Sequence, residues 1–285
     1  MKRTIEEIVT IYELEPSTNR DVFVEGVSDR ELIVWYMSEL GQSGRAVYPI
    51  DLVDVPSGLL QELGLPHGSN RSRVIALAIR VWQEISQEQC GLIFIVDRDL
   101  ADFIDGQIPP RGIVMTDGAS MDGYLLSDSS VDKYLSLVCR VAPLYVCGVR
   151  ESIYRILAYT FALRIALQRL NMAVRIVSLS KLISIDGVAV SINEVELVRR
   201  TLLAGNQVAR LNEVFDEIKD IRAIVDAKAG GDFANGHDAF LVLGECANSM
   251  ARDSAYREER RVRMALMMAL KRSDLDEREL FKLVM

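Results

Sequence analysis

Two short apolar runs, each followed at once by an acidic residue, constrain the fold of this chain most. Val22–Val24 precedes Glu25, and Leu92–Val96 precedes Asp97. The second run is continuous and rich in β-branched residues, as is typical of a strand that is covered on both faces of a parallel sheet. Ligands of open α/β sheets bind at the carboxyl ends of the strands. We therefore expect Glu25 and Asp97 to lie at one edge of a sheet.

The segments around these runs alternate between helical and extended patterns. Apolar residues recur at helical spacing in 29–40 and in 72–86, whereas short apolar runs at 46–50 and 112–115 indicate further strands. Strands that alternate with helices are typical of a parallel sheet with helices on both sides. The sequence therefore predicts an α/β fold with a mostly parallel sheet flanked by helices.

The pattern changes near residue 130, after which helical spacing prevails. We expect a sheet-containing domain over 1–130 and a mainly helical domain over 131–285. A turn is predicted at 17–20, and one further strand at 174–179. The apolar helix faces of the second domain suit either internal packing or a surface for a partner.

Composition narrows the class of protein. The formal net charge of −8 argues against a protein coated in positive charge, such as a non-specific DNA binder. No run approaches the roughly 20 apolar residues that span a membrane, and the first residues lack the apolar core of a signal peptide. The cysteines have neither the spacing of a zinc site nor the context of a disulfide framework, which indicates reduced thiols in a cytoplasmic protein. They are Cys90, Cys139, Cys147 and Cys246.

Asp99 adds a third acid to the predicted sheet edge. It follows Asp97 by two residues, so both side chains point the same way if the chain stays extended. Clustered carboxylates repel unless a cation joins them, and oxygen ligands favour Mg²⁺ or Mn²⁺ over zinc. Such a site suits phosphodiester hydrolysis. Each acid alone is more simply interpreted as a helix cap or a solvated turn residue, but the joint pattern favours a metal site.

The acid-bearing segments also resemble a known family. Val-Glu-Gly-Val-Ser-Asp at 24–29 and Val-Asp-Arg-Asp at 96–99 are similar in order and spacing to the motifs of the Toprim fold, which topoisomerases, primases and OLD-type nucleases share. Met-Asp-Gly-Tyr-Leu-Leu at 121–126 resembles a segment in which related proteins carry Glu-Asn-Tyr. Asn-Gly-His-Asp at 235–238 resembles a Gly-His-Asp motif in their C-terminal part. Together these segments resemble the AriB family, the Toprim effectors of PARIS phage-defence systems.

The resemblance implies roles for five acids. Glu25 would be a metal ligand or the general base, and Asp97 and Asp99 would bind the metal. Asp29 matches an acid that ligates a second metal in OLD-type nucleases, and its alternative role is that of a helix cap. Asp122 replaces a glutamate of the family by a side chain one methylene shorter, which leaves direct and water-bridged contact with the metal open.

The resemblance further implies a Mg²⁺- or Mn²⁺-dependent endonuclease that an ATPase partner restrains and that cleaves RNA, specifically tRNA, when it is released. The chain has no Gly-x-x-x-x-Gly-Lys-Ser/Thr motif of its own, in keeping with an ATPase supplied in trans. A single shallow acidic edge also favours a homodimer, because a second subunit would help to hold a long substrate.

Several arginines are candidates for contact with that substrate. The segment 139–181 has seven basic residues and one acidic residue, and a local basic face is enough to bind nucleic acid. We single out Arg150 and Arg155 in this segment, and Arg98 between the two acids of its motif. The alternative is that these arginines pair with acids from elsewhere in the chain.

His237 lies in the glycine-rich stretch near the C-terminal end. Its functional interpretation is phosphate contact or proton transfer near the scissile bond. Its structural interpretation, which we favour, is a histidine that pairs with Asp238 and holds the loop in place.

Other functions on the same fold stay open. One is a non-catalytic regulatory or binding module whose acids bind Mg²⁺ for structure, and another is an OLD-like nuclease that cleaves DNA. A primase or topoisomerase is disfavoured, because the four cysteines cannot build a zinc module and no domain with a nucleophilic tyrosine is evident.

Overall fold

The chain divides into two compact units, and each is described by itself. The computed structural model describes residues 2–14, 21–42, 44–85, 91–104, 106, 108–225 and 231–284, so the predicted turn at 17–20 and Cys90 lie outside the described residues. The first unit contains 1–98, 107–117 and 275–285, and the second contains 99–106 and 118–274. The division thus falls at 117/118 instead of the predicted 130/131, and the C-terminal segment belongs to the first unit.

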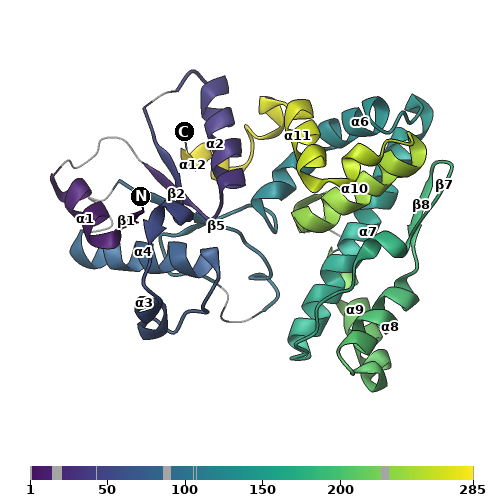
Figure 1. The fold of residues 1–285 in the computed structure, drawn as a ribbon, viewed down its shortest axis with the longest axis horizontal. Coiled ribbons are helices and arrows are strands. Elements are labelled where there is room, and N and C mark those ends of the chain that lie inside the picture. Colours follow the sequence, from purple (N-terminus) through teal and green to yellow (C-terminus); the bar gives the residue numbers. More distant parts are fainter. Residues whose placement is uncertain are drawn as a thin grey trace. The chain divides into compact units, whose positions relative to one another are not determined.

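A four-stranded parallel sheet forms the centre of the first unit (Figure 1). Its order is β3-β2-β5-β6, and all three neighbouring pairs run parallel. Each strand is short and apolar, as the sequence predicted, and the predicted parallel sheet with flanking helices is confirmed. The strands are β2 (Val22–Val24), β3 (Val47–Pro49), β5 (Ile93–Val96) and β6 (Val114–Met115).

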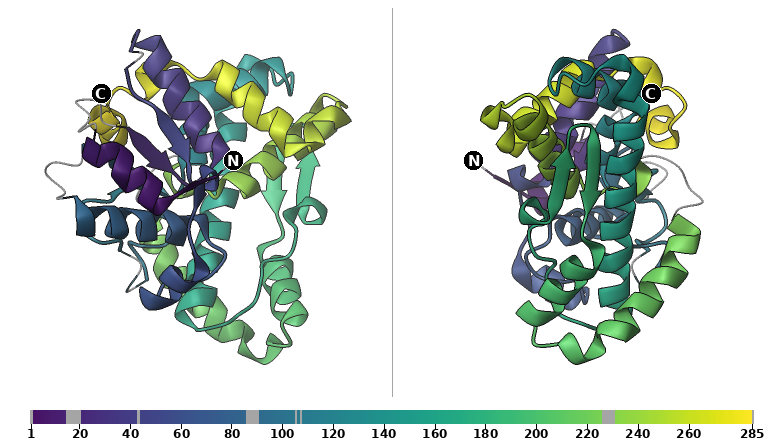
Figure 2. Two further views of the ribbon diagram at one scale, coloured as in Figure 1. Left: turned by 60° about the vertical axis from the view of Figure 1, so that its left-hand side comes forward. Right: turned by 90° about the vertical axis from the view of Figure 1, so that its right-hand side faces the viewer.

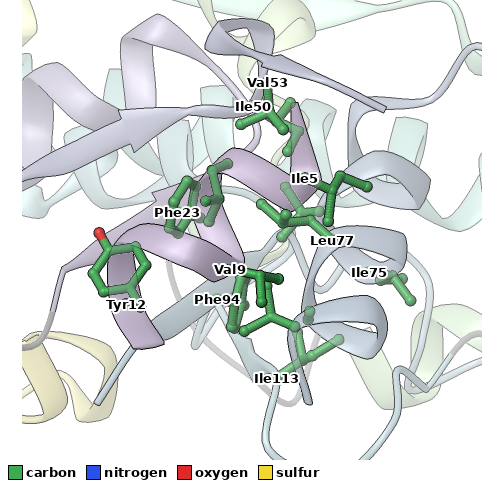
Figure 3. Close-up of a cluster of buried hydrophobic side chains, with 14 of the residues drawn as sticks. Ile5, Val9, Tyr12, Phe23, Ile50, Val53, Ile75, Leu77, Phe94 and Ile113 are labelled. Carbon is green, nitrogen blue, oxygen red and sulfur yellow. The ribbon is translucent and has the colours of Figure 1, made fainter. Parts of the chain in front are cut away.

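Helices α1 (Ile5–Leu14) and α4 (Asn70–Glu84) cover one face of this sheet (Figure 3). Their apolar residues pack on Phe23 and Phe94, whose stacked rings lie 5.6 Å apart between centroids. Burial of this apolar surface is the main force that holds the helices against the sheet. The cluster includes Ile5, Ile8, Val9, Val74, Leu77, Ala78 and Val81.

Helix α2 (Val27–Glu39) lies on the opposite face of the sheet (Figure 1). The C-terminal helix α12 (Glu279–Val284) packs against it, since the ring of Phe281 meets the ring of Tyr36 edge-on at 4.7 Å between centroids. The Tyr36 hydroxyl donates a hydrogen bond of 3.1 Å to Asp276. These contacts explain why the C-terminal segment belongs to the first unit.

A small parallel ladder accompanies α1. Thr4 and Glu7 form a capping box at the start of α1, because each side chain accepts the other residue's N–H, at 3.2 Å and 2.8 Å. The remaining elements of the first unit are β1 (Arg3–Thr4), its parallel partner β4 (Val53–Asp54), the 3-10 turn Ile50–Leu52 and α3 (Ser57–Glu62).

The second unit is mainly helical, and the long helix α7 (Pro143–Arg169) runs through it (Figure 2). Pro143 suits the first position of this helix, where the missing N–H has no partner to lose. Among the described residues, no helix is both long and apolar enough to span a membrane. The other helices are α6 (Asp128–Leu137), α8 (Glu194–Ala204), α9 (Leu211–Val225), α10 (Gly236–Met250) and α11 (Glu259–Ala269), with 3-10 turns at Met121–Leu126, Leu179–Lys181, Val208–Arg210, Gly231–Phe233, Ser254–Arg257 and Arg272–Asp274.

An antiparallel hairpin of β7 (Ile183–Asp186) and β8 (Ala189–Ile192) packs beside α7 (Figure 2). The strand predicted at 174–179 is wrong, because these residues, all described, form no strand. Gly187 has a φ of 59°, the left-handed conformation that a two-residue hairpin turn requires. The two loop residues are Gly187 and Val188, and the glycine at the first loop position was the available signal.

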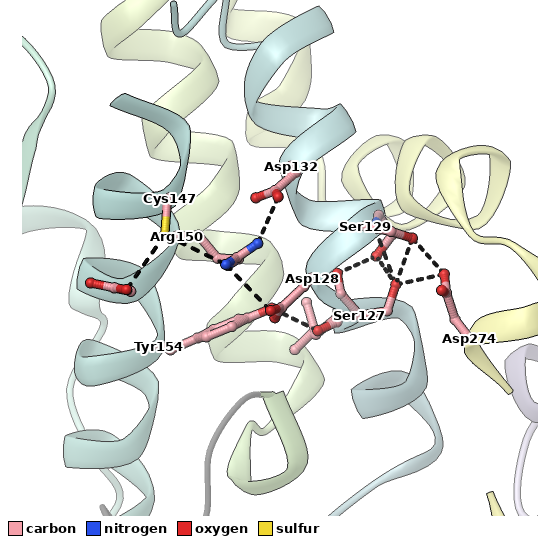
Figure 4. A network of polar contacts seen from close by, with 11 residues as sticks. Ser127, Asp128, Ser129, Asp132, Cys147, Arg150, Tyr154 and Asp274 are labelled. Carbon is pink, nitrogen blue, oxygen red and sulfur yellow. Dashed lines mark hydrogen bonds and ion pairs between the residues drawn. The ribbon is translucent and has the colours of Figure 1, made fainter. Parts of the chain in front are cut away.

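A polar network around Asp274 gives a pH prediction (Figure 4). Ser127 and Ser129 donate hydrogen bonds of 2.9 Å and 2.6 Å to Asp274 Oδ2, and the Lys271 N–H donates another of 3.2 Å. Partial burial raises the pKa of Asp274, but these hydrogen bonds together lower it by more. Its pKa therefore lies below the ordinary value. The stability that Asp274 contributes is therefore present above the unfolded-state pKa of about 4 and is lost as pH falls.

We expect wild-type protein to lose more stability than Asp274→Asn as the pH falls from neutral into the acid range, since only the wild type must protonate this carboxylate. Urea unfolding at a series of pH values measures the difference. Parallel curves for the two proteins would contradict the assignment.

Candidate functional site

The two acids predicted to share a sheet edge come together in the first unit. β2 and β5 pair in parallel, with Val22 opposite Ile93, so both strands end at the same edge. Glu25 directly follows β2, and Asp97 directly follows β5. The N–H of Asp97 donates a hydrogen bond of 2.8 Å to Glu25 Oε1. The carboxylate of one acid therefore contacts the main chain of the other.

Two residues at the start of α4 hold the main chain at both acids. Asn70 Nδ2 donates a hydrogen bond of 2.9 Å to the Glu25 carbonyl, and the Arg71 guanidinium donates to the Asp97 carbonyl. Ser69 caps the helix with its side chain, so that α4 begins at Asn70. Sequence reasoning missed both residues. The polar Ser-Asn-Arg start of an apolar helix was the only local signal.

The donor set at this edge suits a hard cation. Among the described residues, no group of three or more His, Cys, Asp or Glu side chains is placed to hold a metal ion. Mg²⁺ at phosphoryl-transfer sites, however, is usually held by one or two carboxylates, with water and substrate phosphates as the other ligands. Glu25 and Asp97 supply that number of carboxylates and only oxygen donors. The residues present therefore fit Mg²⁺ or Mn²⁺ and do not fit zinc.

Asp29 lies in the first turn of α2 and is buried. Its Oδ2 accepts the N–H of Gly26 at 2.8 Å, and its Oδ1 accepts the Ser28 hydroxyl at 3.3 Å. Both oxygens thus contact the start of the helix, which supports the helix-cap interpretation over that of a second metal ligand.

Loss of this cap gives a stability prediction. Asp29→Ala should lower the free energy of unfolding by about 1 kcal/mol, because the Gly26 N–H loses its acceptor. Asp29→Asn keeps an oxygen acceptor and should cost less. Urea unfolding compares the two variants, and equal losses would show that the charge of Asp29 matters more than its hydrogen bond.

Asp99 belongs to the second unit. Its φ of 47° is left-handed, so the chain is not extended here, which was the condition for Asp97 and Asp99 to point the same way. The Asp99 N–H donates to the Ala119 carbonyl at 2.7 Å, and the Ala119 N–H donates to the Asp232 carbonyl at 2.7 Å. A Cβ on Gly118 would lie 2.7 Å from that same carbonyl oxygen, so this close approach requires glycine.

Asp122 also belongs to the second unit, where it pairs with Arg263. Arg263 Nε lies 3.2 Å from Asp122 Oδ1. Burial raises the pKa of Asp122, and the guanidinium opposes this shift. Gly236 packs against the carboxylate so closely that a Cβ there would lie 2.4 Å from Asp122 Cβ. These contacts give Asp122 a structural role, and its predicted metal contact stays a prediction.

The two charged residues of the Gly-His-Asp motif have separate partners. His237 is 69% exposed and its Nδ1 lies 2.7 Å from Glu259, so the predicted pairing of His237 with Asp238 is wrong. Asp238 is 8% exposed and forms a 2.7 Å ion pair with Arg164. Adjacent residues of a helix point in different directions, which explains the separation. The motif thus starts α10 with one surface contact and one buried contact.

The three predicted substrate-contact arginines differ in their surroundings. Arg98 donates to Thr116 twice, from its N–H at 2.9 Å and from Nε at 2.8 Å. Arg150 is 14% exposed and pairs with Asp128 and Asp132 at 3.3 Å and 2.6 Å, as Figure 4 shows. Arg155 is exposed. The contacts of Arg150 support the interpretation of a structural arginine, whereas Arg155 stays accessible to a polyanion.

The arrangement in the first unit is chemically specific. Two carboxylates follow adjacent parallel strands, and main-chain and amide hydrogen bonds orient the segment that carries them. Such a pair can bind a divalent cation or accept a proton from water.

No model of a protein family matches the chain, and no curated protein matches it either.

Proposed function

We propose that this protein is a metal-dependent phosphodiesterase of the Toprim type, with Glu25 and Asp97 in its active site. The observation that carries the proposal is the contact between these acids at the carboxyl ends of β2 and β5, with the Asp97 N–H bound to Glu25 Oε1. Glu25 and Asp97 are 72 residues apart in sequence, and the pairing of two adjacent parallel strands brings them together. Acids with only local roles in surface loops would not need this arrangement.

Each residue would contribute a distinct part of the chemistry. When bound, Mg²⁺ or Mn²⁺ supplies a Lewis acid that polarises the phosphoryl oxygen and lowers the pKa of a bound water. Glu25 would either hold the cation or take the proton of the attacking water, and Asp97 would hold the cation. For Asp99, contact with the metal stays a prediction from the Asp-x-Asp motif of the sequence.

The biological setting that we propose rests on the resemblance to the AriB family. It comprises cleavage of RNA, with tRNA as the substrate, in phage defence, release from an ATPase partner, and a homodimer as the active form. A DNA substrate, as for OLD-type nucleases, is the alternative within the same chemistry.

A non-catalytic binding module is the second candidate. It is favoured by the structural contacts of two predicted ligands, since Asp29 caps α2 and Asp122 pairs with Arg263. In that case the remaining acids would bind a cation only to stabilise the sheet edge.

Metal removal tests the proposed function directly. Purified protein should cleave total RNA when millimolar Mg²⁺ or Mn²⁺ is present, and EDTA should abolish cleavage, because two carboxylates alone cannot activate water and stabilise the leaving oxygen. Gel analysis of RNA and of plasmid DNA in parallel identifies the substrate. Cleavage that persists in EDTA would contradict the metal mechanism. Inert RNA and DNA, both with and without an ATPase partner, would favour the binding module.

A further inference from the structure

The first residue of α4, Asn70, contacts the main chain of the candidate site. Asn70 Nδ2 donates to the Glu25 carbonyl at 2.9 Å, 45 residues away in sequence. Glu25 stands between the end of β2 and Gly26, which precedes α2. A hydrogen bond to its carbonyl therefore fixes the main chain where it leaves the strand. The main-chain direction at this point sets the direction of the Glu25 side chain. We propose that Asn70 is a positioning residue for Glu25, an inference that rests on the proposed function.

The amide of Asn70 is itself held in one orientation. Asn70 Oδ1 accepts a hydrogen bond of 2.9 Å from Arg73 Nη1, so its NH₂ group is the end that faces Glu25. Arg73 is anchored in turn, because its Nη2 donates to the carbonyls of Ile50 and Val53 at 3.0 Å and 2.9 Å. A relay of hydrogen bonds therefore runs from the segment after β3 through Arg73 and Asn70 to Glu25.

We expect the relay to affect metal affinity more than substrate affinity, because it orients the segments that carry the two carboxylates. Asn70 contacts the main chain of Glu25, and Arg71 contacts the main chain of Asp97. One helix turn thus fixes both segments that carry the carboxylates. Partners of this kind, which orient ligands without touching the metal, typically change metal affinity about 10- to 100-fold when they are lost.

The variant Asn70→Asp isolates the bond to Glu25. Its carboxylate still accepts from Arg73, but it has no donor for the Glu25 carbonyl. The added negative charge alone would strengthen cation binding, so weaker binding by a folded Asn70→Asp variant indicates lost positioning. We expect Mn²⁺ affinity to fall about 10-fold or more, and kcat to fall while KM for the nucleic acid stays unchanged.

A matched control is available in the second unit. Asn193 caps α8 through its Oδ1, which accepts the N–H of Glu196 at 3.0 Å. Asn193→Asp makes the same chemical change at another helix start, keeps the acceptor, and should leave Mn²⁺ affinity unchanged. If Asn70→Asp fails to fold by urea unfolding, Arg73→Gln releases Asn70 from behind and should weaken Mn²⁺ binding in the same direction.

Titration with Mn²⁺, followed by electron paramagnetic resonance of the free ion, decides the inference without an activity assay. Weaker binding by Asn70→Asp and unchanged binding by Asn193→Asp support it. Equal affinity of Asn70→Asp and wild type overturns it. Wild-type protein that binds Mn²⁺ but cleaves no nucleic acid removes the proposed function and leaves this test valid. Wild-type protein that binds no Mn²⁺ removes both.

Discussion

Glu25→Gln should reduce the rate of RNA cleavage by about 10²- to 10⁴-fold and leave the fold intact. Gln retains an oxygen that can accept the Asp97 N–H, which donates to Glu25 Oε1 at 2.8 Å in the wild type. It lacks the negative charge with which a carboxylate attracts a divalent cation, and it cannot accept a proton from water. The substitution therefore removes the chemistry and keeps the contact between the strand ends.

Single-turnover cleavage in Mg²⁺, with urea unfolding as a check of the fold, measures this loss. Glu84→Gln is the matched control, because Glu84 lies on α4 with its side chain 48% exposed and its carboxylate 3.8 Å from Arg80. It should cleave at the wild-type rate, since exposed ion pairs contribute little. Equal rates for Glu25→Gln and wild type would remove Glu25 from the active site.

The same variant separates the two roles that stay open for Glu25. If Glu25 ligates the metal, Glu25→Gln should lose Mn²⁺ affinity together with activity. If it acts as the general base, Mn²⁺ affinity should be kept and only the rate should fall. A metal titration of one variant thus distinguishes a ligand from a base.

The sheet edge was predictable because the signal is local. An apolar run followed by an acid identifies both a strand and its end, as in Val22–Val24 before Glu25, and parallel strands place their ends together. Helix starts were less predictable. Helix α4 begins at Asn70 instead of 72, because Ser69 caps it, and apolar periodicity does not register a polar first turn.

Contacts between distant segments were out of reach of the sequence. The C-terminal residues belong to the first unit, where Phe281 contacts Tyr36. This was not predictable, because the sequence of an apolar helix face does not show which surface it packs against. The Asn70 amide meets Glu25 through one hydrogen bond across 45 residues, and such a pair leaves no periodic trace. Asp adopts a left-handed φ more readily than most residues, but the sequence does not show that Asp99 is one of the positions where this happens.

The aspartate of the Gly-His-Asp motif, Asp238, should contribute strongly to the stability of the fold. Asp238→Ala should lower the free energy of unfolding by about 3 kcal/mol, because it leaves the charge of Arg164 without its partner. The pair is 2.7 Å long, with Asp238 8% and Arg164 32% exposed. Partial exposure of Arg164 places the loss at the lower end of the range for buried pairs. Within the described residues, the buried Arg164 Nε has no hydrogen-bond partner, so the guanidinium has little alternative support.

Urea unfolding of three proteins tests this interpretation. Asp238→Ala should be strongly destabilised, and Asp238→Ala combined with Arg164→Met should recover part of the loss, because no unpaired charge remains. His237→Ala should stay within about 0.5 kcal/mol of wild type, since its contact with Glu259 is on the surface. If His237→Ala keeps its stability but loses cleavage, His237 is a catalytic residue. If it keeps both, the motif serves only to anchor α10 to α7 through Asp238 and Arg164.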